Sequence, residues 1–201
     1  MLRPEWPLQT ARLVLRPFAR DDFEDAFAYL SRPDVVRYLY WEPATRESFQ
    51  DVLDRKAGRT AFEREGEGIN AAVVPRDVGR VVGDVALLWT SERHKQGEVG
   101  FVFHPDFQGR GYATEAARAV LQLGFERLGL HRIAGRLDGR NTASARVLKR
   151  LGMRREAHLV QNEYVKGEWT DEVIYAVLAR EWAAAGRAGR AGRAGRAGRA
   201  R

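Results

Sequence analysis

A glycine-bearing segment, Gln108–Ala113 (QGRGYA), constrains the fold of this chain more than any other feature of the sequence. The apolar, β-branched and aromatic run Val99–Phe103 before it predicts a strand. After it, apolar residues recur at helical spacing as far as Leu128, which predicts a helix. Backbone N–H groups at the start of a helix lack partners and lie at the positive end of the helix dipole. The sequence therefore predicts an anion site suited to a pyrophosphate, reinforced by the cation of Arg110.

Two better-known phosphate loops do not match this segment. A dinucleotide-binding fingerprint requires a third glycine at the position of Thr114, and no acidic residue stands at the required spacing after a following strand. A P-loop requires a Gly-Lys-Ser or Gly-Lys-Thr ending, which is missing here. The dinucleotide-binding and P-loop classes are therefore not favoured.

A second segment, 141–153, has the pattern Asn-x-x-Ser followed by an amphipathic run and Leu-Gly-Met. Asn141 or Thr142 is suited to cap a helix, and Gly152 supplies the left-handed residue that ends one. A strand predicted at Arg132–Leu137 separates the two segments. This region is predicted to run strand, glycine loop, helix, strand, polar loop, helix.

These two segments, in this order, resemble the cofactor segments of the GCN5-related N-acetyltransferase (GNAT) family. The family's pyrophosphate loop reads Gln-x-x-Gly-x-Ala, and its second cofactor segment begins with Asn-x-x-Ser. The resemblance extends over residues 10–182 and implies one acetyltransferase domain of the α/β class. The implied fold is a mixed, mostly antiparallel sheet with a splayed parallel strand pair and helices on both faces. Acetyl-CoA is the implied co-substrate, held between the two splayed strands.

The resemblance also assigns residues to the site. Those assigned to acetyl-CoA are Phe101, Phe103, Gln108, Gly109, Arg110, Gly111, Tyr112, Ala113 and Asn141. The base that deprotonates the amine is assigned to Glu163, and the acid that protonates the thiolate to Ser144. Tyr164 and Tyr175 are alternative acids, because a phenol with a pKa of about 10 matches a thiolate leaving group. Glu163 has an alternative reading as an outward-facing strand residue paired with Lys166.

Both ends of the domain resemble the ribosomal-protein N-terminal acetyltransferase subgroup, through Thr10–Pro17 and Gln161–Asp171. This subgroup implies direct attack by a protein N-terminal α-amine in a ternary complex. A small-amine acetyltransferase, acting on an aminoglycoside or a polyamine, is an alternative, and so is a non-catalytic acyl-CoA-binding module. Exposed aromatics expected at Tyr40 and Trp41 would line the acceptor groove.

The C-terminal segment 186–201 repeats Gly-Arg-Ala and holds six of the 34 basic residues but no acid. The rest of the chain has 28 basic and 27 acidic residues, so the tail accounts for six of the seven net positive charges. Apart from arginine, the tail has no side chain larger than alanine, and it is expected to be disordered. It has either no role or a weak electrostatic contact with RNA or the ribosome.

Composition limits the remaining functions. The chain has no cysteine, which excludes a disulfide framework and a route through an acetyl-cysteine. Its four histidines lack metal-ligand spacing, so a metal site is not expected. No apolar run could span a bilayer and the N-terminus lacks a signal pattern. A cytoplasmic enzyme, monomeric or homodimeric, is expected.

The other predicted elements complete this fold. Helices are expected at Asp21–Leu30, at Asp34–Tyr38 and from Thr45 to about Arg64. Further strands are expected at Leu13–Arg16, Ile69–Val74, Val81–Trp89, Leu159–Val165 and Glu172–Leu178. The last two form a predicted hairpin across Lys166-Gly167.

Overall fold

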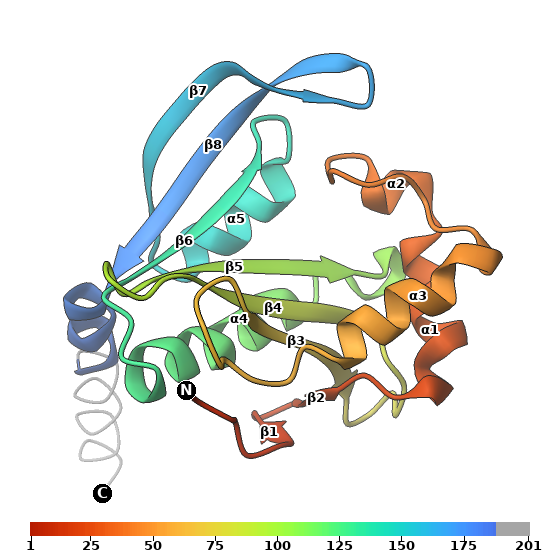
Figure 1. The fold of residues 1–201 in the computed structure, drawn as a ribbon, viewed down its shortest axis with the longest axis horizontal. Coiled ribbons are helices and arrows are strands. Elements are labelled where there is room, and N and C mark those ends of the chain that lie inside the picture. Colours follow the sequence, from red (N-terminus) through yellow and green to blue (C-terminus); the bar gives the residue numbers. More distant parts are fainter. Residues whose placement is uncertain (188–201) are drawn as a thin grey trace, which may run out of the picture.

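The computed structural model describes residues 1–187, so almost all of the Gly-Arg-Ala tail lies outside the described residues. One eight-stranded sheet, in the order β1-β2-β3-β4-β5-β6-β8-β7, forms the centre of the molecule (Figure 1). The strands are β1 (Leu8–Gln9), β2 (Leu13–Pro17), β3 (Gly68–Pro75), β4 (Gly83–Ser91), β5 (Gln96–Phe103), β6 (Arg132–Asp138), β7 (Arg154–Val165) and β8 (Glu168–Leu178). The helices are α1 (Phe23–Leu30), α2 (Pro33–Val36), α3 (Arg46–Ala57), α4 (Tyr112–Gln122) and α5 (Thr142–Arg150), and residues 179–187 are also helical. Among residues 1–187, no helix has the length and apolarity needed to cross a bilayer.

All neighbouring strands of the sheet are antiparallel except β5 and β6. These two run parallel and pair only over Gln96–Glu98 and Arg132–Ala134. Beyond this stretch they diverge, so Val99–Phe103 pairs with β4 along one edge and with no strand along the other. The predicted mixed sheet with a splayed parallel pair is confirmed.

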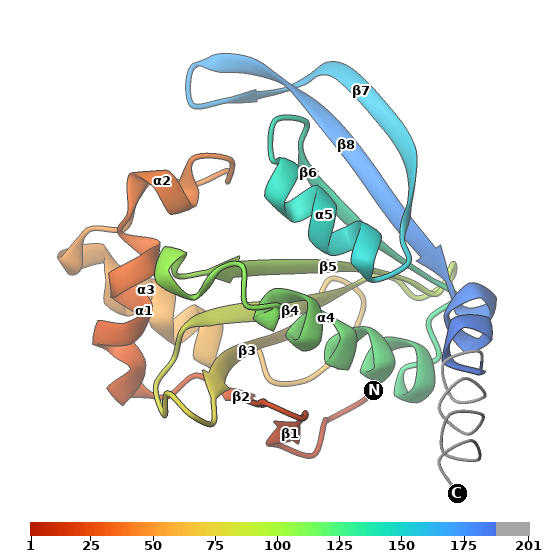
Figure 2. The same cartoon turned by 180° about the vertical axis from the view of Figure 1, so that it is seen from behind.

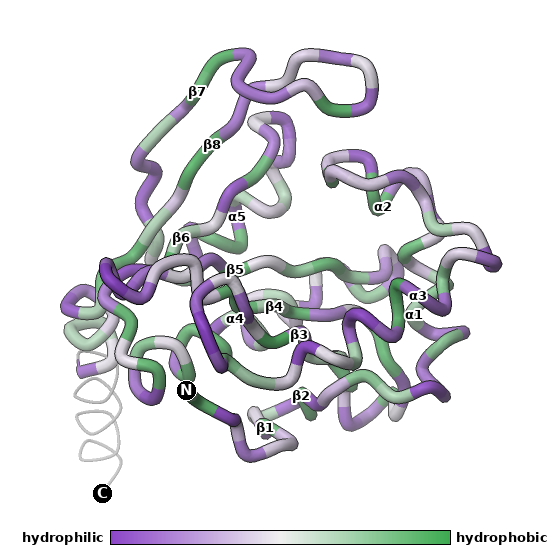
Figure 3. Tube along the Cα trace, in the orientation of Figure 1, coloured by the Kyte–Doolittle hydropathy of each residue, from purple (hydrophilic) through white to green (hydrophobic). Residues whose placement is uncertain are grey.

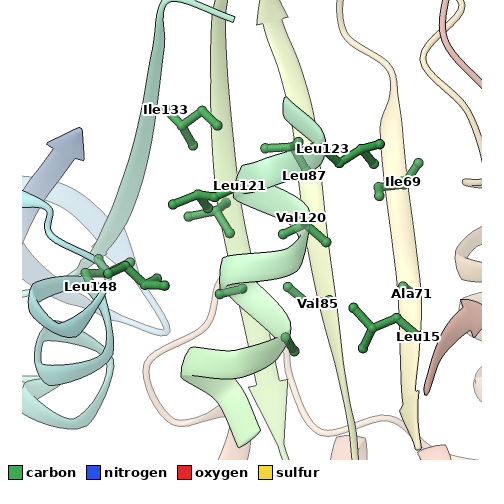
Figure 4. Close-up of a cluster of buried hydrophobic side chains, with 14 of the residues drawn as sticks. Leu15, Ile69, Ala71, Val85, Leu87, Val120, Leu121, Leu123, Ile133 and Leu148 are labelled. Carbon is green, nitrogen blue, oxygen red and sulfur yellow. The ribbon is translucent and has the colours of Figure 1, made fainter. Parts of the chain in front are cut away.

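Helices cover both faces of the sheet, as predicted (Figures 1 and 2). On one face, Val120 and Leu121 of α4 belong to the same buried cluster as Val85 and Leu87 of β4 (Figure 4). On the other face, α1 and α3 contribute to a second, smaller cluster around Phe49. Because both faces are covered, β3 and most of β4 are buried along nearly their whole length.

Local signals set most of the element ends. Thr45 caps α3 by accepting a hydrogen bond from Ser48 N at 3.3 Å. The helix ends at Ala57 with Gly58 as its C-cap, so the predicted extension to about Arg64 is wrong. Glycine disfavours helix continuation, and the residues that follow form isolated bridges to two other segments instead.

The strands differ from prediction mainly at the two edges of the sheet. Two residues are too few to carry an alternating pattern, so β1 has no counterpart among the predicted strands. Strand β7 begins at Arg154 rather than Leu159, because its first half is a largely exposed edge strand that pairs with β8 (Figure 3). The turn of the hairpin falls at Lys166-Gly167, as predicted, with a positive φ at both residues.

Candidate active site

The glycine loop lies between the end of β5 and the start of α4. Gly109 and Gly111 have φ of +76° and +81°, a left-handed conformation that glycine adopts readily, and Gly111 is the N-cap of α4. The first amide of this helix with a backbone acceptor is Glu115 N, which donates to Gly111 O at 3.0 Å. Within residues 1–187, the amides of 109–114 have no backbone acceptor. Unpaired donors therefore gather at the positive end of a helix dipole, as the sequence predicts.

Arg12, on the segment before β2, bonds to the glycine loop and to the first turn of α4. Its Nη1 donates to the carbonyl oxygen of Arg110 at 3.0 Å, and its Nη2 pairs with Glu115 Oε2 at 2.7 Å. Glu115 also accepts a hydrogen bond from Thr10 Oγ1 at 2.7 Å. Burial would raise the pKa of Glu115, but the hydrogen bonds from Thr10 and Arg12 outweigh it and lower that pKa. Glu115 therefore stays charged and links the loop to the segment between β1 and β2.

A cavity of about 390 Å³ opens in front of the loop, which we call the coenzyme cleft. Its lining comes from the end of β5, the glycine loop, the first turn of α4, one face of α5 and the segment around α2. Thr114 Oγ1 lies buried on this lining and has no hydrogen-bond partner in the described part of the chain. An orphaned hydroxyl beside unpaired amides fits a ligand that brings hydrogen-bond acceptors, such as a pyrophosphate.

Most residues assigned to acetyl-CoA line the coenzyme cleft, namely Phe101, Phe103, Gln108, Gly109, Gly111, Tyr112, Ala113 and Asn141. Arg110 does not line it. Its guanidinium lies over the ring of Phe107, 5.1 Å from the centroid, and donates to Asp106 O at 3.2 Å. The cations that line the cleft are Arg146 and Arg150 of α5. The sequence analysis misses these two, because helical spacing does not tell which face of α5 meets a cavity.

A smaller cavity of about 100 Å³, which we call the acceptor pocket, adjoins the cleft where β5 and β6 diverge. The two cavities share the lining residues Tyr38, Leu39, Phe101, Asn141 and Ser144. Glu163 of β7 lines the acceptor pocket but not the coenzyme cleft. The structure therefore brings Glu163 and Ser144, the two residues assigned to catalysis, to the walls of one pocket.

Ser144 lies in the first turn of α5 at the junction of the two cavities. Asn141 caps this helix, its Oδ1 accepting a hydrogen bond from Ser144 N at 3.0 Å. The amide of Ser144 is thus satisfied by a side chain, whereas its hydroxyl has no hydrogen bond within residues 1–187. That hydroxyl is available to a ligand in either cavity.

Glu163 is held by a residue from the opposite wall of the pocket. Tyr40, on the segment between α2 and α3, donates its phenol proton to Glu163 Oε2 at 2.6 Å. Partial burial and the carboxylate of Glu163 raise the pKa of Tyr40, so the phenol keeps its proton and remains a donor. The alternative pairing of Glu163 with Lys166 is not found. Lys166 Nζ donates instead to the carbonyl oxygen of Val36 in α2 at 2.7 Å.

Two further carboxylates lie near Glu163, with one guanidinium between them. Arg136 of β6 pairs with Glu172 of β8 at 2.7 Å and with Glu98 of β5 at 3.6 Å. Burial raises the pKa of Glu98; Arg136 opposes this shift, and Glu172 and Glu163 add to it. The sequence analysis misses Glu98, Arg136 and Glu172, although each is a charged residue in an otherwise largely apolar strand. Their proximity follows from strand pairing and not from their order in the chain.

The two tyrosines considered as acids lie elsewhere. Tyr164 follows Glu163 on β7, where successive side chains point to opposite faces, and it packs against Trp169 of β8. Tyr175 is buried on β8. Neither residue lines the coenzyme cleft or the acceptor pocket. The exposed aromatics expected between α2 and α3 are found, since Tyr40 and Trp41 are both exposed.

One family model, described as an acetyltransferase (GNAT) domain, matches residues 12–154. This range includes the glycine loop, the Asn-x-x-Ser segment and both splayed strands. The chain belongs to the GNAT family. It is an acetyl-CoA-dependent N-acetyltransferase with the mixed sheet expected from the sequence. Glu163 and the hairpin that carries it follow the matched range.

Three similar proteins place this GNAT enzyme among bacterial relatives. The uncharacterized N-acetyltransferase YnaD of Bacillus subtilis (strain 168) is 35% identical over 178 residues, which cover 87% of this chain and 98% of YnaD. Spermidine N(1)-acetyltransferase of Escherichia coli (strain K12) is 25% identical over 170 residues, which cover 85% of this chain and 88% of that enzyme. The crystal structure of a GNAT-family acetyltransferase from Bacillus anthracis has a TM-score of 0.78 at 31% identity, covering 87% of this chain and 99% of that protein. Of the three, only the most distant in sequence is named for an acceptor.

Proposed function

We propose that this GNAT enzyme transfers the acetyl group of acetyl-CoA to a primary amine by direct attack in a ternary complex. The observation that carries the proposal is the junction of the coenzyme cleft and the acceptor pocket at Asn141 and Ser144. The cleft has the donors for a pyrophosphate, and the pocket has a carboxylate, Glu163, that can act on an amine. Both ligands can be bound at once, with their reacting ends at the junction. A covalent acetyl-cysteine is not available, since the chain has no cysteine.

The coenzyme supplies the acetyl group as a thioester, already activated for transfer to an amine. The amides of the glycine loop and Thr114 hold its pyrophosphate. Val99–Phe103 of β5 pairs with β4 along one edge only, so alternate backbone N–H groups face the splayed gap. Such a group donates to the negative charge that develops on a carbonyl oxygen during acyl transfer.

Glu163 removes the proton of the acceptor ammonium group, directly or through a water molecule. An α-amine has a reference pKa of about 8, so a carboxylate base has only a modest barrier to overcome near neutral pH. The hydrogen bond from Tyr40 orients the carboxylate of Glu163. Ser144, at the junction, donates a proton to the departing thiolate.

We assign the acceptor to a protein N-terminal α-amine, the substrate of the subgroup that both ends of the domain resemble. Two contacts between distant segments support this choice. Lys166 bonds the Val36 carbonyl, and Tyr40 bonds Glu163, so the region of α2 is linked twice to the β7–β8 hairpin. A chain end enters a pocket of about 100 Å³ beside such contacts more readily than the middle of a continuous chain does.

A polyamine is the second candidate, favoured by the charge around the acceptor pocket. Glu98 and Glu172 share a single guanidinium, that of Arg136, and the charge of Glu163 is close enough to raise the pKa of Glu98 further. The surplus negative charge suits an acceptor with more than one ammonium group. The E. coli relative at 25% identity is named for spermidine.

The test is thiol release from acetyl-CoA with a panel of amines. The panel holds peptides with a free N-terminus, the same peptides with a blocked N-terminus and an internal lysine, spermidine, and an aminoglycoside. We expect release only with the peptides whose α-amine is free. Release with spermidine alone would select the second candidate, and release with the blocked peptides would contradict both.

A further inference from the structure

A cavity of about 570 Å³ plays no part in the proposed reaction. Its lining comes mainly from α5 and the β7–β8 hairpin, and we call it the α5–β7 groove. Figure 2 shows the helix and the hairpin. Helix α5 separates the groove from the coenzyme cleft, and among their lining residues the two share only Arg146. Its volume lies within the usual range of small-molecule sites.

The groove is lined by cations that lack acidic partners. Arg146 and Lys149 of α5 stand on one wall and Arg155 of β7 on the other, and none pairs with a carboxylate within residues 1–187. A fourth cation, Arg140, is neutralised by Asp138 and Glu168. Three positive charges from two elements therefore face a shared space.

Asp171, the acidic residue that lines the groove, already has two hydrogen-bond partners. Asp171 lies 2.7 Å from His158 Nε2 and accepts a hydrogen bond from Gln161 N at 2.9 Å. The backbone bond of Gln161, followed by His158, lowers the pKa of Asp171, so its charge persists and remains committed to these partners. Asp171 therefore does not compensate Arg146, Lys149 or Arg155.

The groove also has an aromatic wall. Trp169 of β8 lines it and is 60% exposed, although tryptophan carries a large apolar surface. Its ring makes a T-shaped contact with the ring of Tyr164, 5.4 Å between ring centroids. The floor includes Leu137 and Val173. An exposed, supported indole above an apolar floor is suited to stack with a planar ring.

We propose that the α5–β7 groove binds a phosphorylated nucleotide, its phosphates between Lys149 and Arg155 and its base on Trp169. Arginine and lysine bind phosphate oxygens through charge-assisted hydrogen bonds, and the indole offers stacking that tolerates any base. The cations and the indole line one cavity, with Arg155 opposite Tyr175 and Trp169 beside the β7–β8 turn, so such a ligand would extend along the groove. The groove shares Arg146 with the coenzyme cleft and Leu137 and Thr170 with the acceptor pocket, but neither Glu163 nor the glycine loop lines it. The proposal does not depend on which amine is acetylated.

The test uses ADP as the probe and the full chain saturated with coenzyme A, so that the coenzyme cleft is filled. Calorimetry and tryptophan fluorescence should both report one saturable site. The double variant Lys149→Ala/Arg155→Ala should weaken ADP binding by about tenfold or more, because two charge-assisted contacts are lost. Trp169→Leu should weaken binding and remove the fluorescence response. Coenzyme A binding should be unchanged in both variants, which shows that they fold.

Arg93→Ala, which removes an exposed arginine from the β4–β5 turn, is the matched control and should bind ADP normally. Three outcomes would overturn the proposal. These are no ADP binding to the coenzyme-saturated enzyme, ADP binding that survives the double variant, and equal affinity for inorganic pyrophosphate and ADP. A glutamate-rich peptide that binds more tightly than ADP would also overturn it, and would identify the groove as a surface for acidic protein segments.

Discussion

At the scale of single residues, the contact between Tyr40 and Glu163 positions a carboxylate in the acceptor pocket. Two residues 123 positions apart meet at 2.6 Å, and the phenol is the donor. The raised pKa of Tyr40, caused first by burial and then by Glu163, keeps this proton on the phenol. The hydrogen bond therefore fixes the position of one carboxylate oxygen of Glu163 in the acceptor pocket.

Glu163→Gln keeps the size of the side chain but cannot accept a proton. We expect kcat to fall by roughly a hundredfold at neutral pH, the usual contribution of a general base. The loss should shrink as pH rises, because more of the amine is then neutral. Acetyl-CoA affinity should hold, since Glu163 does not line the coenzyme cleft. Steady-state kinetics across pH, with the preferred acceptor, make the measurement.

The matched control for this variant is Glu168→Gln. Glu168 lies on the same hairpin, where it pairs with Arg140 and does not line the acceptor pocket. Its variant should keep wild-type kcat. Near-normal turnover of Glu163→Gln would remove Glu163 from the mechanism and direct attention to Glu98, the neighbouring carboxylate with a raised pKa.

At the scale of elements, contacts within the chain fix the turn from β5 into α4. Its two glycines have left-handed φ, and Arg12 secures the turn through Arg110 O and Glu115. The unpaired amides of the turn therefore need no rearrangement to meet a pyrophosphate. Preorganisation of this kind reduces the entropy lost on binding.

A comparison of two glycines distinguishes the effect of the left-handed conformation on folding stability from its effect on coenzyme binding. Gly109 and Gly79 have φ of +76° and +72°, and a Cβ at either would meet no atom within 4 Å. Alanine at either position should cost about 1 kcal/mol of folding stability, because both residues are left-handed. Only Gly109 borders the coenzyme cleft. Gly109→Ala should therefore also weaken acetyl-CoA binding by about tenfold or more, the effect of a disturbed hydrogen bond to a charged group.

Calorimetric titration and thermal unfolding of both variants make this measurement. Equal affinities for acetyl-CoA in Gly109→Ala and Gly79→Ala would count against the glycine loop as the pyrophosphate site. A fall in melting temperature for Gly109→Ala alone would show that the two positions differ in strain.

At the scale of the whole molecule, a buried polar network joins the helices of one face to the sheet. Asp84 of β4 is 3% exposed and accepts hydrogen bonds from Tyr29 of α1 at 2.8 Å and Lys56 of α3 at 2.9 Å. Asn70 of β3 donates to the same carboxylate at 3.4 Å. A buried charge is tolerated only when it is paired in this way, so the network specifies how α1 and α3 sit on the sheet.

This network makes stability depend on pH in the alkaline range. Burial, then the charge of Asp84, raises the pKa of Tyr29 well above its ordinary value. Below about pH 10, Tyr29 is neutral in both the folded and unfolded states, so its contribution is fully present. At higher pH the unfolded chain loses the proton while the folded chain keeps it, so the free energy of unfolding falls by about 1.4 kcal/mol per pH unit from this group.

Tyr29→Phe should therefore be less stable than the wild type at about pH 8, by about 1–3 kcal/mol, because one hydrogen bond is lost. Its free energy of unfolding should also lack the part of the decrease at high pH that Tyr29 causes. The gap between the two proteins should narrow by about 1 kcal/mol near pH 11. Urea unfolding at both pH values makes the measurement. Tyr164→Phe removes an exposed phenol instead and should track the wild type at both. A gap that stays constant would mean that Tyr29 ionises in the folded protein.

The local elements of the site could be predicted from the sequence, because their signals act within a few residues. Gly111 starts α4, Asn141 caps α5, and Gly152 supplies the left-handed residue after α5, all at their predicted positions. Ser144 and Glu163, the residues assigned as acid and base, also line one pocket. The family resemblance, and not their spacing in the sequence, pointed to them. The end of α3 was harder to predict, because apolar residues continue at helical spacing past Gly58.

Only the tertiary structure decided which distant side chains meet. The sheet order places β8 between β6 and β7, so Glu98, Arg136 and Glu172 share a corner with Glu163 although four strands contribute them. It also places the β7–β8 hairpin across from α5, where the two line a groove. The sequence by itself determined the elements, their caps and the phosphate-type loop, since these depend on neighbours along the chain. The partners of Glu163 and the unpaired cations of the groove depend on strand order and on which face each side chain takes, which no local pattern encodes.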